Sequence, residues 1–210
     1  MIRAWGGWCE MCGDHIVEQH VHSIDVMNWF LGTHPVNCTS FGYRTRRTGG
    51  NMYDFFSTDY EFPNGVHIHS MCRQVTGCWD RIGQFFRGEK GIVDITGLVA
   101  ADRVFLGRGD RTTRFTLPKL EGNKNSYIQE HVDLLDSVIQ GKALNEAGTI
   151  AESTLTAIMG RISAYTGKMV TWDEMLESDF ACRPSAADFE AGTVTMPPEE
   201  APVPGGRSLG

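Results

Sequence analysis

Two alternating runs of residues joined by a short turn constrain the fold of this chain more than any other feature of its sequence. Aromatic and β-branched side chains occupy every second position over residues 56–62, and apolar or small side chains alternate with polar ones over residues 66–72. Pro63, Asn64 and Gly65 separate the two runs, and these residue types favour a tight turn. The pattern predicts an antiparallel β-hairpin with one buried face.

Further strands are expected on both sides of this hairpin, from Val36 to about Phe115. The clearest candidates lie near residues 91–95, 103–106 and 112–116. Because successive strands with short connections pair antiparallel, we expect an open, mainly antiparallel sheet with helices packed on one face. An order of helix, strands and then helices is typical of the α+β class.

Three longer helices are predicted from apolar residues that recur every three or four positions. The first runs from about 15 to 31, between a capping Asp14 and Gly32. The second follows Asn125, ends at Gly141 and has His131 on its apolar stripe, where we expect a satisfied core histidine. The third runs from about 150 to 166. Thr171 and Glu174 then form a capping-box pattern for a short final helix.

The length and composition fit one domain with a tail. A chain of 210 residues with 41% hydrophobic residues can bury a substantial core. We expect a short N-terminal segment over residues 1–12, a main domain over 13–183, and an extended or disordered Pro-rich tail over 184–210.

The charge and hydropathy exclude several classes of partner. A formal net charge of −7 argues against nucleic acid, because phosphate binding needs clustered Lys and Arg. No run approaches the ~20 apolar residues of a membrane span. The first twelve residues also lack the apolar core of a signal peptide. The sequence therefore predicts a cytoplasmic protein with no membrane partner and with reduced cysteines.

The predicted first helix carries an unusual polar cluster. On a continuous helix five side chains fall within an arc of about 80° beside the apolar stripe. They are His15, Glu18, His22, Asp25 and Trp29. Imidazoles and carboxylates can move protons near neutral pH, and an indole can stack on a sugar. The alternative is a set of caps and ion pairs on a half-buried helix.

Several segments of the sequence resemble the Gfo/Idh/MocA oxidoreductase family, over nearly the whole chain. Residues 13–25 read GDHIVEQHVHSID, residues 151–161 read AESTLTAIMGR, and Asn145-Glu146-Ala147 precedes the second of these segments. Cys72-Arg73 and the run GCWDR at residues 77–81 also resemble its bacterial-type members. The resemblance implies that residues 13–183 are the substrate-binding and oligomerisation domain of a two-domain sugar or polyol dehydrogenase.

The resemblance also implies roles for individual residues. His22 is the expected acid/base at a sugar hydroxyl or carbonyl, and Glu18 the residue that orients the substrate or His22. The family more usually has Asp at the position of Glu18. Substrate binding is expected from a further set of residues, with Asp25 also able to hold His22 through a hydrogen bond. These are His15, His20, Asp25, Arg73 and Trp79.

The half of the family fold that binds NAD(P) is not expected in this chain. The resemblance implies a Glu-Lys-Pro segment in the first domain, whose Lys the family uses. That segment is missing here, since Glu89-Lys90 is followed by Gly91. Gly107-Arg108-Gly109 lacks the third glycine and the helix of a dinucleotide fingerprint, so it is interpreted as a hairpin turn. No cofactor site is predicted here, and NAD(P) is implied only for a full-length relative. The front of the chain therefore looks shortened.

Other patterns are less specific. Cys9 and Cys12 precede several histidines, but without a second cysteine pair ordinary thiols are favoured over zinc, and no metal site is predicted. One face of the strand at 66–72 should line either a sugar pocket or an oligomer interface, or form a mixed polar surface. It carries His67, His69, Met71 and Arg73.

Three functions remain open on the sequence. The first is the substrate domain of a sugar oxidoreductase that forms a homo-oligomer through the open sheet. The second is a stand-alone binding or assembly module. The third is a cofactor-free or metal-assisted sugar lyase or epimerase, which the histidine-rich segment would serve.

Overall fold

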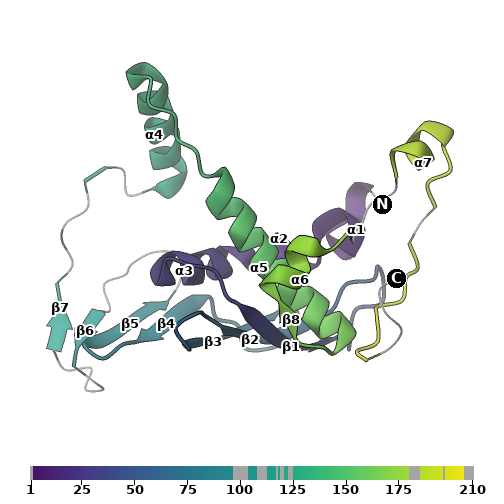
Figure 1. Cartoon of the computed structure of the whole chain (residues 1–210), viewed down its shortest axis with the longest axis horizontal. Coiled ribbons are helices and arrows are strands. Elements are labelled where there is room, and N and C mark those ends of the chain that lie inside the picture. Colours follow the sequence, from purple (N-terminus) through teal and green to yellow (C-terminus); the bar gives the residue numbers. More distant parts are fainter. Residues whose placement is uncertain are drawn as a thin grey trace. The chain divides into compact units, whose positions relative to one another are not determined.

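A computed structural model of the chain describes residues 2–96, 104–107, 113–116, 118, 121–122, 125–179, 185–195 and 197–205. These residues belong to two compact units (Figure 1). The first unit comprises Met1–Gly77 and Ala147–Gly210, and the second comprises Cys78–Glu146.

The first unit contains a four-stranded antiparallel sheet in the order β3-β2-β1-β8. Its strands are β1 (Asn37–Tyr43), β2 (Phe55–Glu61), β3 (His67–Arg73) and β8 (Val170–Thr171). The predicted hairpin is confirmed as β2 and β3, with Glu61 opposite His67. Gly65 occupies the turn with a φ of 72°, a conformation that costs glycine little.

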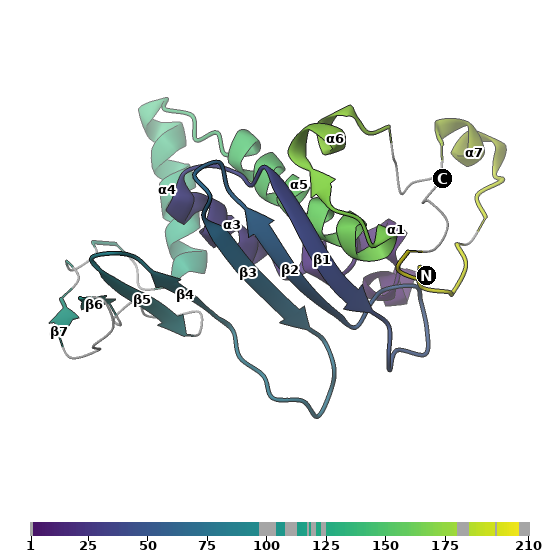
Figure 2. The same ribbon diagram turned by 60° about the horizontal axis from the view of Figure 1, so that its bottom comes forward.

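Helices cover one face of this sheet (Figure 2). The helices of the first unit are the 3₁₀ helix η1 (Ile2–Gly7), α1 (Cys9–Cys12), α2 (His15–Glu18), α3 (Val21–Leu31), α5 (Ala147–Thr166), α6 (Trp172–Glu177) and α7 (Ala186–Ala191). Burial alternates strictly along β2, where Phe56, Thr58 and Tyr60 are buried beneath the helices. The α+β class, with open antiparallel sheets and helices packed against a sheet, is therefore confirmed.

The helix α5 approaches the sheet closely because its buried face carries small side chains. The buried positions include Ser153, Thr156, Ala157, Gly160, Ser163 and Ala164. A Cβ atom at Gly160 would lie 2.4 Å from the Tyr60 hydroxyl oxygen. That hydroxyl donates to the Thr156 carbonyl at 3.2 Å, and the Ser40 backbone N–H donates to Ser163 Oγ at 2.9 Å. Close packing therefore allows polar contacts between helix and strands.

The segment after residue 184 is not wholly extended. Its Ser185 and Asp188 form a reciprocal capping box that begins α7. Further along, the Tyr53 hydroxyl donates to the Pro202 carbonyl at 2.6 Å, and the Gly205 N–H donates to the Thr166 carbonyl. The sequence predicts an extended or disordered tail, and its described residues include α7 and these contacts with Tyr53 and Thr166.

The second unit contains an antiparallel sheet in the order β4-β5-β6-β7. Its elements are β4 (Gly83–Arg87), β5 (Gly91–Thr96), β6 (Val104–Leu106), β7 (Thr113–Phe115) and α4 (Ser126–Gln140). The strands expected near 91–95, 103–106 and 112–116 correspond to β5, β6 and β7. The turn expected at 107–109 falls mostly on residues 108–112, which lie outside the described residues.

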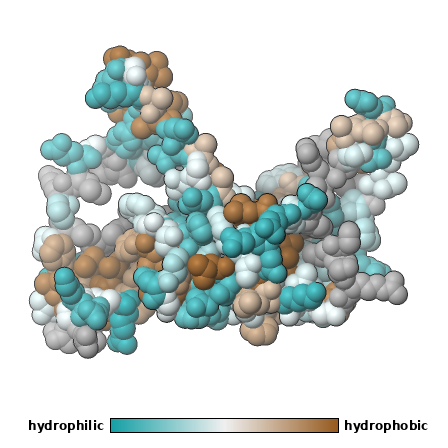
Figure 3. All heavy atoms as spheres, viewed as in Figure 1, coloured by the Kyte–Doolittle hydropathy of each residue, from teal (hydrophilic) through white to brown (hydrophobic). Residues whose placement is uncertain are grey.

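The helix α4 corrects one prediction about burial. Asn125 caps its start and Gly141 ends it, as expected. Its apolar stripe is nevertheless exposed, and hydrophobic residues are visible on it in Figure 3. The His131 side chain is 73% exposed and lies 2.7 Å from the Tyr127 carbonyl, so a core position for His131 is wrong. Periodicity identifies an apolar face but does not show what covers it.

We predict that Gly160→Ala destabilises the chain by about 1–3 kcal/mol, because the added methyl group meets the buried Tyr60 hydroxyl. Gly148→Ala is the matched control, since a Cβ there has nothing within 4 Å. That substitution should stabilise the helix by up to about 1 kcal/mol. Urea unfolding measures both, and equal effects of the two substitutions would contradict the close packing.

Candidate functional site

The predicted first helix is interrupted, and this changes the geometry of the candidate site. The backbone N–H groups of Gln19 and His20 both donate to the His15 carbonyl, and a new helix then starts at Val21. A single continuous helix over 15–31 is therefore wrong, and so is the single arc of five polar side chains derived from it. Two short helices, α2 and α3, carry these residues instead (Figure 1).

The structure places the two expected catalytic residues on different helices. Glu18 is the last residue of α2 and is half-buried, whereas His22 lies in the first turn of α3 and is exposed. Asp25 is half-buried and accepts a hydrogen bond from the Ser153 hydroxyl at 2.6 Å. This bond ties Asp25 to α5, a contact that helical periodicity alone does not predict.

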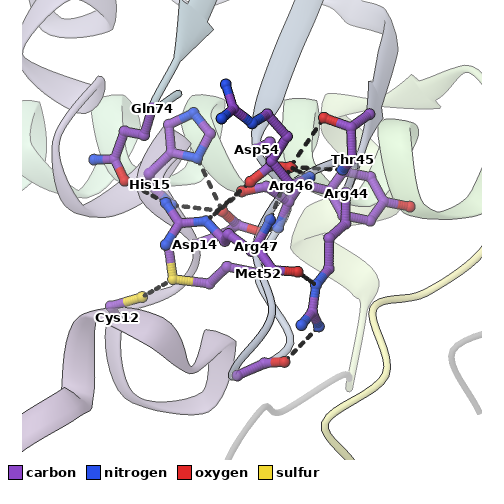
Figure 4. Close-up of polar contacts among 12 residues, drawn as sticks. Cys12, Asp14, His15, Arg44, Thr45, Arg46, Arg47, Met52, Asp54 and Gln74 are labelled. Atoms are coloured by element: carbon purple, nitrogen blue, oxygen red, sulfur yellow. Dashed lines mark hydrogen bonds and ion pairs between the residues drawn. The ribbon is translucent and has the colours of Figure 1, made fainter. Parts of the chain in front are cut away.

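His15 belongs to a buried polar centre built around the Asp14 carboxylate (Figure 4). Asp14 Oδ1 accepts from the His15 backbone N–H at 2.6 Å and lies 3.2 Å from His15 Nδ1. Asp14 Oδ2 accepts from the Tyr53 N–H at 2.9 Å and from the Tyr165 hydroxyl at 2.5 Å. Burial, with the nearby Asp14 charge, raises the pKa of Tyr165 well above its ordinary value, which keeps this hydroxyl a donor.

The backbone of Asp14 adopts an unfavourable conformation at this position. Its φ of 73° and ψ of 160° lie in a region that is nearly restricted to glycine. Such a conformation persists only where the surroundings hold it, and here four hydrogen bonds converge on one fully buried carboxylate. The sequence identified Asp14 only as a helix cap; Tyr53 and Tyr165 gave no local signal.

His20 forms a second link between the helices and the sheet. Its Nε2 lies 2.7 Å from the Ser70 hydroxyl oxygen on β3. Burial lowers the pKa of His20 to about 4, with a smaller contribution from the neighbouring His15. The imidazole is therefore neutral at physiological pH. Its contact with Ser70 keeps the residues between α2 and α3 next to β3.

Arg73 lies on the other face of the first sheet from this helical region, and Trp79 is in the other unit. Arg73 is exposed on the face of β3 that points away from the helices, together with His67, His69 and Met71, so the predicted sharing of one face is confirmed. Trp79 belongs to the second unit and is 76% exposed. The structure therefore does not bring Arg73 to the same side of the sheet as His15 and His20.

The cysteines before the first helix form no metal centre in the described part of the chain. The Cys12 thiol lies 3.3 Å from Met52 Sδ, and burial raises the pKa of this thiol to about 11. Among the residues that the structure describes, no group of three or more His, Cys, Asp or Glu side chains is placed to hold a metal ion. Within the same residues, no helix is both long and apolar enough to cross a membrane.

We predict that His20 makes stability depend on pH between about 6.5 and 4. In this window the unfolded chain binds a proton that the folded chain excludes, so stability falls as the pH falls. The contribution of His20 should be roughly 2–3 kcal/mol across the window. Urea unfolding of His20→Gln should show a flatter pH dependence, whereas the exposed control His22→Gln should retain the slope. Parallel slopes for wild type and His20→Gln would refute the prediction.

Comparisons with known proteins give matches among solved structures. No protein-family model matches the chain, and no curated protein matches it. An oxidoreductase from Thermotoga maritima matches with a TM-score of 0.59 and 18% identity, over 81% of this chain and 48% of that one. The WlbA dehydrogenase from Bordetella pertussis, solved with NADH and UDP-GlcNAcA, matches with a TM-score of 0.60 and 17% identity, over 80% and 47%.

A third match is myo-inositol 2-dehydrogenase from Lactobacillus plantarum, with a TM-score of 0.55, 19% identity, and coverage of 76% of this chain and 49% of that one. At such identities the likeness concerns the fold. The chain spans about half the length of the solved structures that it matches. It has the fold of about one half of each of these oxidoreductases.

Proposed function

We propose that this chain is the substrate-binding and assembly half of an NAD(P)-dependent sugar or polyol oxidoreductase of the Gfo/Idh/MocA family. The main support is the structural match, which covers about 80% of this chain and about half of each dehydrogenase. The motif of Glu18, His22 and Asp25 supplies groups suited to proton transfer. In this proposal the nucleotide is bound by a half that this chain does not contain.

His22 is the proposed acid/base for the substrate hydroxyl. It is exposed in the first turn of α3, so a sugar can reach its imidazole. A nicotinamide bound by the other half would supply the hydride acceptor, and the His22 imidazole would take the hydroxyl proton as the carbonyl forms. Glu18, at the end of α2, is proposed to orient the sugar through hydrogen bonds to its hydroxyl groups.

The other residues of the segment are proposed to hold His22 in place. Asp25 is anchored to Ser153, and the neighbouring Asn28 side-chain amide donates to Thr156 Oγ1 at 3.1 Å. These two bonds fix α3 against α5. His15 and His20 are tied to Asp14 and Ser70, so we propose that both position the helices beneath the substrate.

The sugar proposal predicts weak binding of a polyol or sugar to the chain alone. Ligand-observed NMR with myo-inositol and a panel of hexoses should detect at least one ligand. The double variant Glu18→Ala/His22→Ala should lose that binding, because it removes both side chains proposed to form hydrogen bonds with the sugar. His131→Ala is the control, since this exposed histidine lies in the second unit. Unaltered binding by the double variant would refute the assigned sugar site. Tight binding of NADH to this chain alone would refute the proposal that another half binds the nucleotide.

A second proposed role is self-assembly through the open face of the first sheet. Phe41 on β1 is 71% exposed and Met71 on the edge strand β3 is 70% exposed, and both pair with Ser57 of β2. Polar groups lie between and beside them on the same face, including Ser57 Oγ with His69 Nε2 at 3.1 Å and Asp59 with His67 at 2.7 Å. A surface that combines exposed apolar side chains with polar groups is typical of protein interfaces.

The assembly proposal predicts that Phe41→Glu yields a monomer, because a buried unpaired carboxylate would oppose association. Sedimentation velocity should show a dimer or larger species for the wild type and a monomer for the variant. Phe189→Glu is the control, since Phe189 is exposed on α7 rather than on the sheet. A wild type that stays monomeric at high concentration would exclude this role.

A further inference from the structure

The loop between β1 and β2 carries three arginines close together, Arg44, Arg46 and Arg47. Its backbone folds around the buried Asp54, whose Oδ2 accepts from the N–H groups of Thr45, Arg46 and Arg47 (Figure 4). Burial would raise the pKa of Asp54, but these N–H donors and the Thr45 hydroxyl lower it below its ordinary value. The carboxylate is thus ionised and fixes the shape of the loop.

Two of the arginine side chains reach the same short segment after β3. Arg46 Nη1 donates to the Thr76 carbonyl at 3.1 Å, and Arg47 Nη2 donates to Gln74 Oε1 at 2.6 Å. Their guanidinium groups therefore lie along residues 74–76, a stretch that spans only about 7 Å when extended. Arg73 directly precedes this stretch and is exposed at the end of β3.

The charges in this loop are only partly compensated. Arg47 Nε lies 3.4 Å from Asp54 Oδ1, whereas Arg46 contacts a neutral carbonyl. Within the described residues, Asp54 is the only carboxylate that the side chains of Arg44, Arg46 and Arg47 contact. Arg46 is exposed and uses one of its five N–H donors in the bond to Thr76. A chain of net charge −7 thus presents concentrated positive charge at this end of the sheet.

We propose that Arg46, Arg47 and Arg73 form a binding site for the phosphate group of a small ligand. Guanidinium groups supply paired donors that match the oxygens of phosphate, and one Nη of Arg46 and one Nη of Arg47 are already held by Thr76 and Gln74. A phosphate group carries nearly two negative charges at neutral pH, whereas a carboxylate ligand carries one. Several arginines together therefore suit a phosphate better than a carboxylate. The site uses neither Glu18 nor His22, so it stands independently of the proposed oxidoreductase role.

The test is titration of the full chain with inorganic phosphate at constant ionic strength, followed by NMR of the arginine Nε–H signals. The wild type should saturate, with the Arg46 and Arg47 signals shifting together. Arg46→Gln should weaken binding by about tenfold, because it removes a charge-assisted hydrogen bond. Arg46→Lys keeps the charge but loses the paired donors, so its affinity should fall between the two.

Arg87→Gln is the matched control, since Arg87 is an exposed arginine on β4 in the second unit. It removes the same charge and should leave phosphate affinity unchanged. An equal loss of affinity in Arg87→Gln and Arg46→Gln would mean nonspecific ion screening and would overturn the site. Absence of saturation in the wild type, or tighter binding of acetate than of phosphate, would overturn it as well. Each variant keeps Asp54 and Arg47, which hold the loop.

Discussion

The buried carboxylate of Asp14 is the interaction on which the rest of the first unit depends. It joins the start of α2, the backbone just before β2 and the end of α5, although Tyr53 and Tyr165 lie 39 and 151 residues away from it in the sequence. A fully buried carboxylate is costly unless donors surround it, and here four N–H or O–H groups converge on its two oxygens. These donors also hold the strained backbone of Asp14 in place.

The same centre sets the position of the candidate site. It fixes His15 beneath the helices, and the His20–Ser70 contact then holds the interruption that redirects the chain from α2 into α3. Ser153 and Thr156 of α5 form hydrogen bonds with Asp25 and Asn28 of α3 where the two helices pack together. His22 therefore occupies the exposed start of a helix that is anchored to α5, which would hold the proposed acid/base in place.

The two faces of the first sheet differ in what they present. The helical face contains the polar centre and the helices that carry Glu18 and His22, while the opposite face presents Phe41 and Met71 together with polar side chains. The arginine loop lies at one end of the same sheet and is connected to the polar centre through Tyr53, whose carbonyl accepts from Arg47 Nε. Arg73 belongs to the open face, so the proposed phosphate site borders the surface proposed for assembly.

Local patterns in the sequence determined the α+β class, the β2–β3 hairpin around Gly65, the caps at Asn125 and Gly141, and the shared face of His67 and Arg73. Each depends on neighbours within a few residues, so spacing alone predicts it. Only the tertiary structure decided the interruption of the first helix, the exposure of His131 and the hydrogen bonds of Asp14 and Asp25. Those features depend on partners far away in the chain, such as Ser70, Ser153 and Tyr165, and periodicity contains no information about which distant side chain will meet a polar group.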